Sequence, residues 1–320
     1  MFVVISLKST TAQSLLAQQF LALQKKKMRL NILGDDEIEA LFGLPRFTHE
    51  ERVQYFTLSP TETTALEQLH SVKSRIHFLL QLGYFKARRM FFVFSLPEVG
   101  EDAGYIQEQY FPNSPLISLD ITKVTRLKQQ SLILELCNYR GCDARERQQL
   151  QTKARQAAVV CARPIYIFHE LINYMEQQRI VVPGYSFMQD MVSKAIAYEE
   201  RRLMTIVRNY LQDSDREALM LLLDDPSGMY EITQLKHEPK DFSAGEIKRE
   251  IHRAEQIIDL YRLAKKVLPE LKISTESIKY YASLVTYYSV YRLKRLDINI
   301  VRVYLLCFVH YRIFWKNSNR

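Results

Sequence analysis

Residues 59–83 read SPTETTALEQLHSVKSRIHFLLQLG, and their pattern is that of a helix. Ser59 and Glu62 can form a capping box, with Pro60 at the first helical position. Behind them, apolar residues recur at steps of three and four, as on one face of a helix: Leu66, Leu69, Val72, Ile76, Leu79 and Leu80. We therefore expect one helix that runs from about residue 60 to Gly83.

Signals of the same kind continue along the chain. Helix starts are predicted where a capping residue or a proline precedes an apolar pattern, at Thr48, Asp143, Pro164, Ser186, Ser214 and Ser243. The 320 residues include only 9 Gly and 10 Pro, which argues against a β-sandwich, a collagen or a low-complexity chain. We expect an all-α protein.

The length predicts more than one domain, because a domain usually spans about 100–200 residues. We expect a basic N-terminal extension, two helical domains that each resemble a helix-turn-helix, and the incomplete start of a third helical segment. These parts are predicted to span residues 1–28, 29–145, 146–268 and 269–320. The aromatic residues of the last part are interpreted as the core of two helices, and stacking on single-stranded nucleic acid is the alternative.

The charge is arranged in blocks, and the formal net charge is +8. Residues 73–97 contain five basic residues and no acid. Residues 121–163 contain nine basic and three acidic residues, a balance of +6. Acidic blocks lie on both sides of each of these two basic blocks. Such dense basic blocks fit a polyanionic partner better than diffuse charge does, and solvated helix faces are the alternative interpretation.

Patterns for several kinds of site are missing from the sequence. It has no Gly-rich phosphate loop, nucleophile elbow or zinc-protease motif, and its four cysteines lack the spacing of a zinc site. We therefore expect no catalysis by this chain alone, and neither a metal nor a cofactor. His77, His169 and His310 are interpreted as core residues. Residues 199–202, EERR, are interpreted as an exposed helix face with internal charge pairs.

The apolar stretches do not predict membrane insertion. Residues 298–315 are interrupted by Arg302, His310 and Arg312, so we expect a buried helix there and no membrane span. Residues 1–7 lack the basic region and the cleavage site of a secretory signal. Cysteines in apolar surroundings are typical of reduced thiols, which predicts a cytoplasmic protein.

One predicted helix has the character of a DNA reader. It is capped by Thr122 or Ser118, and its polar, basic first turn is followed by apolar turns. The second helix of a helix-turn-helix needs this order, because its N-terminal end meets base edges in the major groove. An ordinary amphipathic helix with a solvated first turn is the alternative. The turn at residues 182–184, between two helices, suggests a second motif of the same shape.

Longer strings of sequence resemble a known family, the large Tn-three-type (class II, replicative) transposases. They are DEIEALFGLPRF (36–47), YFTLSP (55–60), QLGYFKARRMFF (81–92), TRLKQQSLILELCNYRGCD (125–143), RPIYIFHELINYMEQQRIVVPGYSF (163–187), KHEPKDFS (236–243) and YYASLVTYYSVYRLKRLD (280–297). The resemblance covers roughly residues 29–320 and is to the N-terminal region of these proteins.

The resemblance implies helical DNA-binding domains that recognise the terminal inverted repeats of a transposon. Strand transfer by these transposases needs a Mg-dependent DDE domain in their C-terminal part. The 320 residues stop before that region, so no catalytic carboxylate is carried over. The implied partners are double-stranded DNA and either full-length transposase or a second copy of this chain. The implied location is the bacterial cytoplasm, in association with the nucleoid.

Two DNA contacts are hypothesised from these patterns. In the first contact, the helix that follows Thr122 enters a DNA groove, while basic residues that precede this helix in sequence hold phosphates. The residues of the first contact are Lys73, Arg75, Lys86, Arg88, Arg89, Lys123, Thr125, Arg126, Lys128, Gln129 and Gln130. The second contact comprises Tyr185, Ser186, Gln189 and Lys194. The alternative function is that of a helical regulatory remnant, which associates with full-length transposase through residues 271–320.

Overall fold

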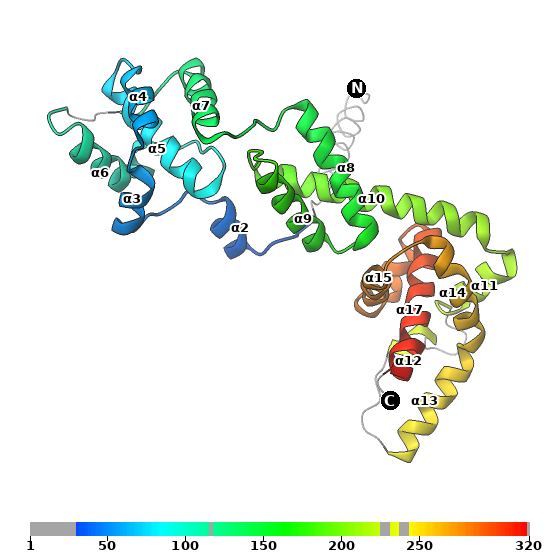
Figure 1. The fold of residues 1–320 in the computed structure, drawn as a ribbon. Coiled ribbons are helices and arrows are strands. Elements are labelled where there is room, and N and C mark those ends of the chain that lie inside the picture. The colour runs from blue at the N-terminus through cyan, green and yellow to red at the C-terminus, as the bar shows by residue number, and fades with distance from the viewer. Residues whose placement is uncertain (1–29, 115–117, 225–230, 237–242, 319–320) are drawn as a thin grey trace, which may run out of the picture. The chain divides into compact units, whose positions relative to one another are not determined.

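The structure is a computed structural model that describes residues 30–114, 118–224, 231–236 and 243–318 (Figure 1). Within these ranges the elements are helices, so the fold is all-α as predicted. Within these ranges, one isolated β-bridge joins extended backbone at Arg140 and Ile180. The basic extension predicted for residues 1–28 lies outside the described residues.

The first helical group is built around α5 (Val72–Arg88), which is buried on every side over most of its length. Each residue from Ile76 to Phe85 is buried. A helix without a polar face belongs inside a protein. Four helices pack around it or against one another: α3 (His49–Phe56), α4 (Pro60–Glu67), α6 (Gly100–Tyr110) and α7 (Lys123–Cys137). A short 3-10 turn, η1 (Leu96–Val99), leads into α6.

The stretch predicted as one helix forms two, α4 and α5. α4 ends at Glu67, and Ser71 starts α5 by accepting a hydrogen bond from the Ser74 amide at 3.2 Å. α5 then continues beyond the predicted end to Arg88, and Arg89 closes it with a left-handed backbone, φ 58°. The apolar spacing continues through the break, so periodicity alone could not reveal it.

Most of the helix caps that the sequence predicts are confirmed. A hydroxyl accepts the amide three residues further on at three predicted starts: Thr48 from Glu51 at 3.3 Å, Ser59 from Glu62 at 3.4 Å and Ser243 from Glu246 at 3.4 Å. The helix start predicted at Ser214 is wrong. α11 (Asp213–Leu221) begins earlier, because Gln212 is its N-cap and the Asp215 carboxylate accepts from the Gln212 amide at 3.1 Å.

The second helical group consists of α8 (Ala144–Val160), α9 (Pro164–Gln177) and the first half of α10 (Tyr185–Tyr210), which pack against one another. Asp143 caps α8 and Pro164 opens α9, as predicted. α10 begins one residue before the predicted Ser186, because Gly184 is its N-cap.

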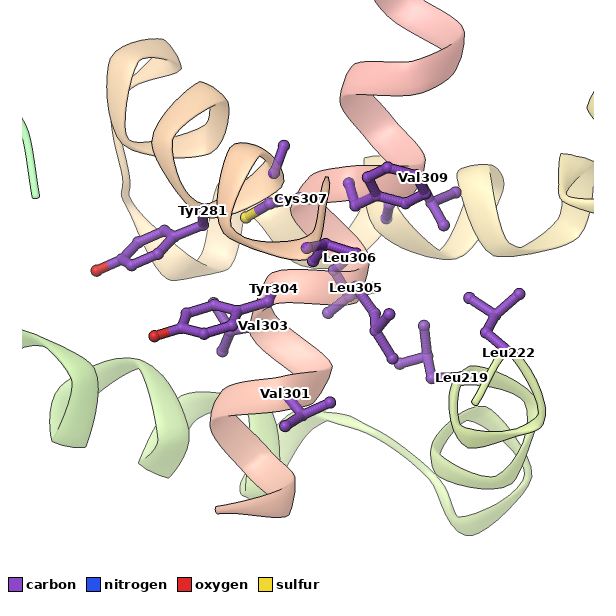
Figure 2. Close-up of a cluster of buried hydrophobic side chains, with 14 of the residues drawn as sticks. Leu219, Leu222, Tyr281, Val301, Val303, Tyr304, Leu305, Leu306, Cys307 and Val309 are labelled. Atoms are coloured by element: carbon purple, nitrogen blue, oxygen red, sulfur yellow. The ribbon is translucent and has the colours of Figure 1, made fainter. Parts of the chain in front are cut away.

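The third group is organised by α17 (Ile298–Ser318), whose residues from Val301 to Val309 are buried apart from Arg302 (Figure 2). This confirms the buried helix predicted there, and no described helix is long and apolar enough to cross a bilayer. The rings of Tyr281 and Tyr304 stack at 5.3 Å, with their hydroxyls at the same end. The other helices of this group are α11, α12 (Glu231–Lys236), α13 (Ala244–Gln256), α14 (Ile258–Leu271), α15 (Thr275–Tyr287) and α16 (Val290–Lys294).

The core of this group includes residues on both sides of Pro269. Pro269 lies inside α14, and Val267 and Leu271 on either side of it are buried in the same core as Leu203 of α10. Tyr287 and Tyr291, which were predicted as core residues, are 83% and 72% exposed and lie outside the core.

The EERR sequence on α10 is not the exposed face that the sequence suggests. Glu199 is 1% exposed and accepts two hydrogen bonds from the Arg202 guanidinium, at 2.8 and 2.6 Å. Arg202 also donates to the Leu271 carbonyl at 2.8 Å. Glu200 accepts from the Tyr304 hydroxyl at 2.7 Å, and burial raises the pKa of its carboxyl. These bonds fasten α10 to the third group.

Two helical glycines give a matched test of the first core. A Cβ added at Gly83 would overlap the ring of Phe56, whereas one added at Gly104 in α6 would meet open space. Gly104→Ala should raise the free energy of unfolding by about 0.5–1 kcal/mol, because Ala favours the helix. Gly83→Ala should lower it by about 1–3 kcal/mol, because the core is overpacked. Urea unfolding followed by circular dichroism measures both, and stabilisation by Gly83→Ala would contradict the packing described here.

Candidate nucleic-acid interface

The first part of the candidate interface is the start of α7. Thr122, one of the two predicted caps, accepts a hydrogen bond from the Thr125 amide at 3.1 Å. Several side chains in the first two turns of α7 are exposed to solvent. Of the predicted groove residues, Lys123 and Lys128 are exposed, and Thr125, Arg126 and Gln130 are half-buried.

Gln129 was predicted to enter a groove, and the structure corrects this. Its side chain is 1% exposed, and its amide nitrogen donates to the carbonyl and hydroxyl oxygens of Ser74 at 2.8 and 2.9 Å. Its Oε1 lies 2.8 Å from Nδ1 of His77, which is also buried. Gln129 therefore holds α7 against α5 and fixes which face of α7 is turned outward.

Two of the predicted phosphate contacts have structural roles within the first helical group. Arg75 donates to the carbonyls of Leu69 at 2.7 Å and Glu67 at 3.3 Å, so it caps the end of α4. Lys86 lies 2.9 Å from the Glu62 carboxylate and ties α5 to α4. Both are half-buried. The remaining members of the basic set on α5 are exposed: Lys73, Arg88 and Arg89.

Backbone hydrogen bonds bring the C-terminal ends of α5, α7 and α9 together. The Arg140 amide donates to the Arg179 carbonyl at 2.8 Å, and the Val181 amide donates to the Arg140 carbonyl at 3.0 Å. The Val182 amide donates to the Arg89 carbonyl at 3.0 Å. We call these five residues the three-helix junction. These three bonds use the main chain. Two of the side chains also bond nearby, since the Arg89 guanidinium donates to the Lys86 carbonyl at 2.6 Å and the Arg140 guanidinium to the Gln178 carbonyl at 3.0 Å.

The side chains at the junction are mostly arginines, and all three of these are exposed: Arg89, Arg140 and Arg179. The Arg89 guanidinium lies 5.6 Å from the centre of the Tyr139 ring. Arg140 is 3.4 Å from the buried Glu146, yet 47% of its side chain is exposed. Guanidinium groups stay charged and match phosphate oxygens with paired donors. The junction therefore presents side chains whose chemistry suits phosphate oxygens.

Further exposed arginines flank the junction in sequence: Arg88 before it, and Arg145 and Arg147 at the start of α8. Arg147 donates to the Cys142 carbonyl at 3.0 Å, and its guanidinium lies 5.5 Å from the Phe187 ring of α10. Exposed arginines thus also occur at the start of the second helical group.

Four of these arginines were not among the predicted contacts. Arg140, Arg145 and Arg147 lie inside the basic block at residues 121–163, so the block was the signal that could have found them. Arg179 lies in an acidic stretch of sequence. Only the backbone pairing with Arg140 brings it to the site.

The second predicted contact includes one residue with a structural role. The Tyr185 hydroxyl accepts hydrogen bonds from the amides of Ile32 at 3.2 Å and Leu33 at 3.0 Å. Its ring lies 5.4 Å from that of Phe42 on α2 (Asp35–Phe42). Tyr185 therefore holds the α2 segment on α10, a structural role that the sequence did not indicate. The other three residues lie along α10: Ser186 and Lys194 exposed, and Gln189 half-buried.

The described residues define a helical protein in which arginines distant in sequence meet at one junction. A family model described as a domain of unknown function, DUF4158, matches residues 32–195. The match covers just over half of the chain, so the chain belongs to this family. It includes the whole three-helix junction. No match to a curated protein was found for the chain.

The contact between α7 and α5 gives a pH prediction. Burial lowers the pKa of His77 from its ordinary value of 6.5, and the nearby Arg126 lowers it further, against the raising effect of the Gln129 hydrogen bond. The unfolded chain therefore binds a proton at pH values where the folded protein leaves His77 neutral. Stability from this site is present above about pH 6.5 and is lost as the pH falls below it.

Nuclear magnetic resonance of the imidazole measures this directly. The titration midpoint of the His77 ring should lie below the ordinary value of 6.5, because burial opposes its protonation. A His77 titration midpoint at or above 6.5 would show that the imidazole is not buried against Gln129.

Proposed function

We propose that this chain binds the terminal inverted-repeat DNA of a transposon, as the N-terminal part of a transposase and without strand-transfer activity of its own. The observation that carries the proposal is the three-helix junction, which gathers Arg89, Arg140 and Arg179 on one exposed surface. The resemblance to Tn-three-type transposases supports it. The strings at residues 36–47, 55–60, 81–92, 125–143 and 163–187 lie within the range of the family match.

In the proposed complex, one set of contacts positions the protein on the duplex and another set reads the base sequence. Arginines at the junction contact phosphates, which fixes the protein on the duplex but carries no base information. The exposed face of α7 meets base edges in the major groove. Gln129 supports this division, because it fixes the orientation of α7 from the buried side. Arg75, Lys86, Gln129 and Tyr185 are not proposed as DNA contacts.

Salt dependence of binding tests the proposal. Fluorescence anisotropy would compare a terminal inverted-repeat duplex of a Tn-three-type transposon with a scrambled duplex, over a series of salt concentrations. The wild-type chain should prefer the repeat, and log affinity should fall linearly with log salt. Arg89→Asn and Arg179→Asn should each reduce the slope by about 0.9, because each removes one phosphate contact.

Asparagine is chosen because both positions have a left-handed backbone, φ 58° and 50°, which asparagine tolerates. Arg262→Asn is the control, since Arg262 is a 73%-exposed arginine of α14, paired with the exposed Asp259. It should leave the slope unchanged. Equal slopes for wild type and both junction variants would rule out the junction as the phosphate contact. Failure to bind any duplex would rule out the proposed function.

We propose as a second candidate that the chain associates with full-length transposase or with itself. The observation that favours it is the exposed apolar face of α13, where Ile247 and Ile251 are 44% and 52% exposed one turn apart. Sedimentation without DNA tests it. The chain should form a larger species that Ile251→Glu dissociates. A monomer at every concentration that also fails to bind the transposase would exclude this candidate.

A further inference from the structure

Two large apolar side chains stand on the outward face of α7. Val124 is 63% and Leu127 51% exposed, and they are three residues apart, so they lie on the same face of the helix. A shallow open groove runs along this face, lined by Val124, Leu127, Lys128, Ser131, Leu132 and Glu135. The core of the first group does not use these two side chains, since its contact with α7 is made from the opposite side, at Gln129 and Ile133.

The apolar pair is surrounded by positive charge. Lys123 and Lys128 flank it and are exposed, and Arg126 is half-buried beside it. The first acid along α7 is Glu135, about two turns beyond Leu127. An apolar patch within a positive field suits a partner that is anionic overall and has apolar groups at the bottom of its groove. Duplex DNA has this character, because the C5-methyl of thymine lies in the major groove between two rows of phosphates.

The dimensions of α7 agree with this partner. A helix with its side chains is about 10–12 Å across, and the major groove is about 12 Å wide. Gln129 and its bonds to Ser74 and His77 fix the rotation of α7, which leaves Val124 and Leu127 on its exposed face. Electrostatics also favours DNA over a protein partner, because no acid lies on the first three turns of this helix to pair with a basic protein surface.

We propose that Val124 and Leu127 contact thymine methyl groups, and hence that the chain requires A·T pairs at one or two fixed positions of its site. This inference rests on the proposed function and adds a residue pair and a base class to it. Lys123 and Lys128 contact the phosphates on either side. Specificity then comes from apolar contact at this end of α7, in addition to any hydrogen bonds made by Arg126 and Gln130.

Replacing thymine by uracil tests this, because the change removes the methyl group and keeps every hydrogen-bonding group of the base. Preferred sites would first be selected from a pool of random duplexes with the full chain. Each thymine of the selected site would then be replaced singly by uracil, and the affinity measured by fluorescence anisotropy. One or two replacements should each weaken binding about fourfold, as expected for loss of one buried methyl-sized group, and the others should have no effect.

Protein variants identify the side chains that contact the methyl. Leu127→Ala and Val124→Ala should weaken binding to the thymine site and abolish the difference between thymine and uracil at one position each. Val93→Ala is the matched control, since Val93 is 83% exposed and lies outside α7. It should leave both affinities and their difference unchanged.

The outcomes separate this inference from the proposed function. Sequence-selective binding with no effect of uracil at any position would overturn the methyl contact and leave DNA binding intact. No binding to any duplex would overturn both. If Leu127→Ala changed the sedimentation of the chain but not its DNA affinity, the face would be a protein contact and the inference would fail.

Discussion

The main-chain pairing of Arg140 with Arg179 and Val181 is the interaction on which the candidate interface depends. It joins the residues that follow α7 to those that follow α9, and the bond from Val182 to Arg89 adds the end of α5. Three helices that end far apart in sequence therefore end at one place. Main-chain bonds of this kind do not pass through the side chains, so arginine can occupy these positions, two of which, Arg89 and Arg179, have a left-handed backbone.

Local chemistry explains which parts of the fold the sequence could predict. The caps at Thr48, Ser59, Asp143 and Ser243 were recognisable because each depends on a side chain and an amide within three residues. The break between α4 and α5 was not recognisable. Ser71 starts a new helix there, but the apolar residues keep their spacing through it. Near Ser214, Gln212 can also cap a helix, and the sequence pattern alone does not show which of the two residues is the N-cap.

The candidate site was predictable only as a region. Charge blocks identified α5 and α7, but a residue's charge does not reveal whether it is needed inside the protein. Arg75 caps α4, Lys86 pairs with Glu62, and Gln129 satisfies Ser74 and His77, and each of these roles depends on a neighbouring helix. Glu199 and Arg202 show the same limit on α10, where an apparently exposed charge pair is fastened to Leu271. Long-range contacts decide which charges remain free.

Chemical modification of arginines tests directly whether the junction arginines together form the contact with phosphates. Phenylglyoxal would be applied to the wild-type chain with and without saturating repeat duplex, and the modified residues mapped by mass spectrometry. The account predicts that DNA protects Arg89, Arg140 and Arg179 together, while the exposed Arg262 is modified equally in both samples. Equal modification of all four with bound DNA would contradict it.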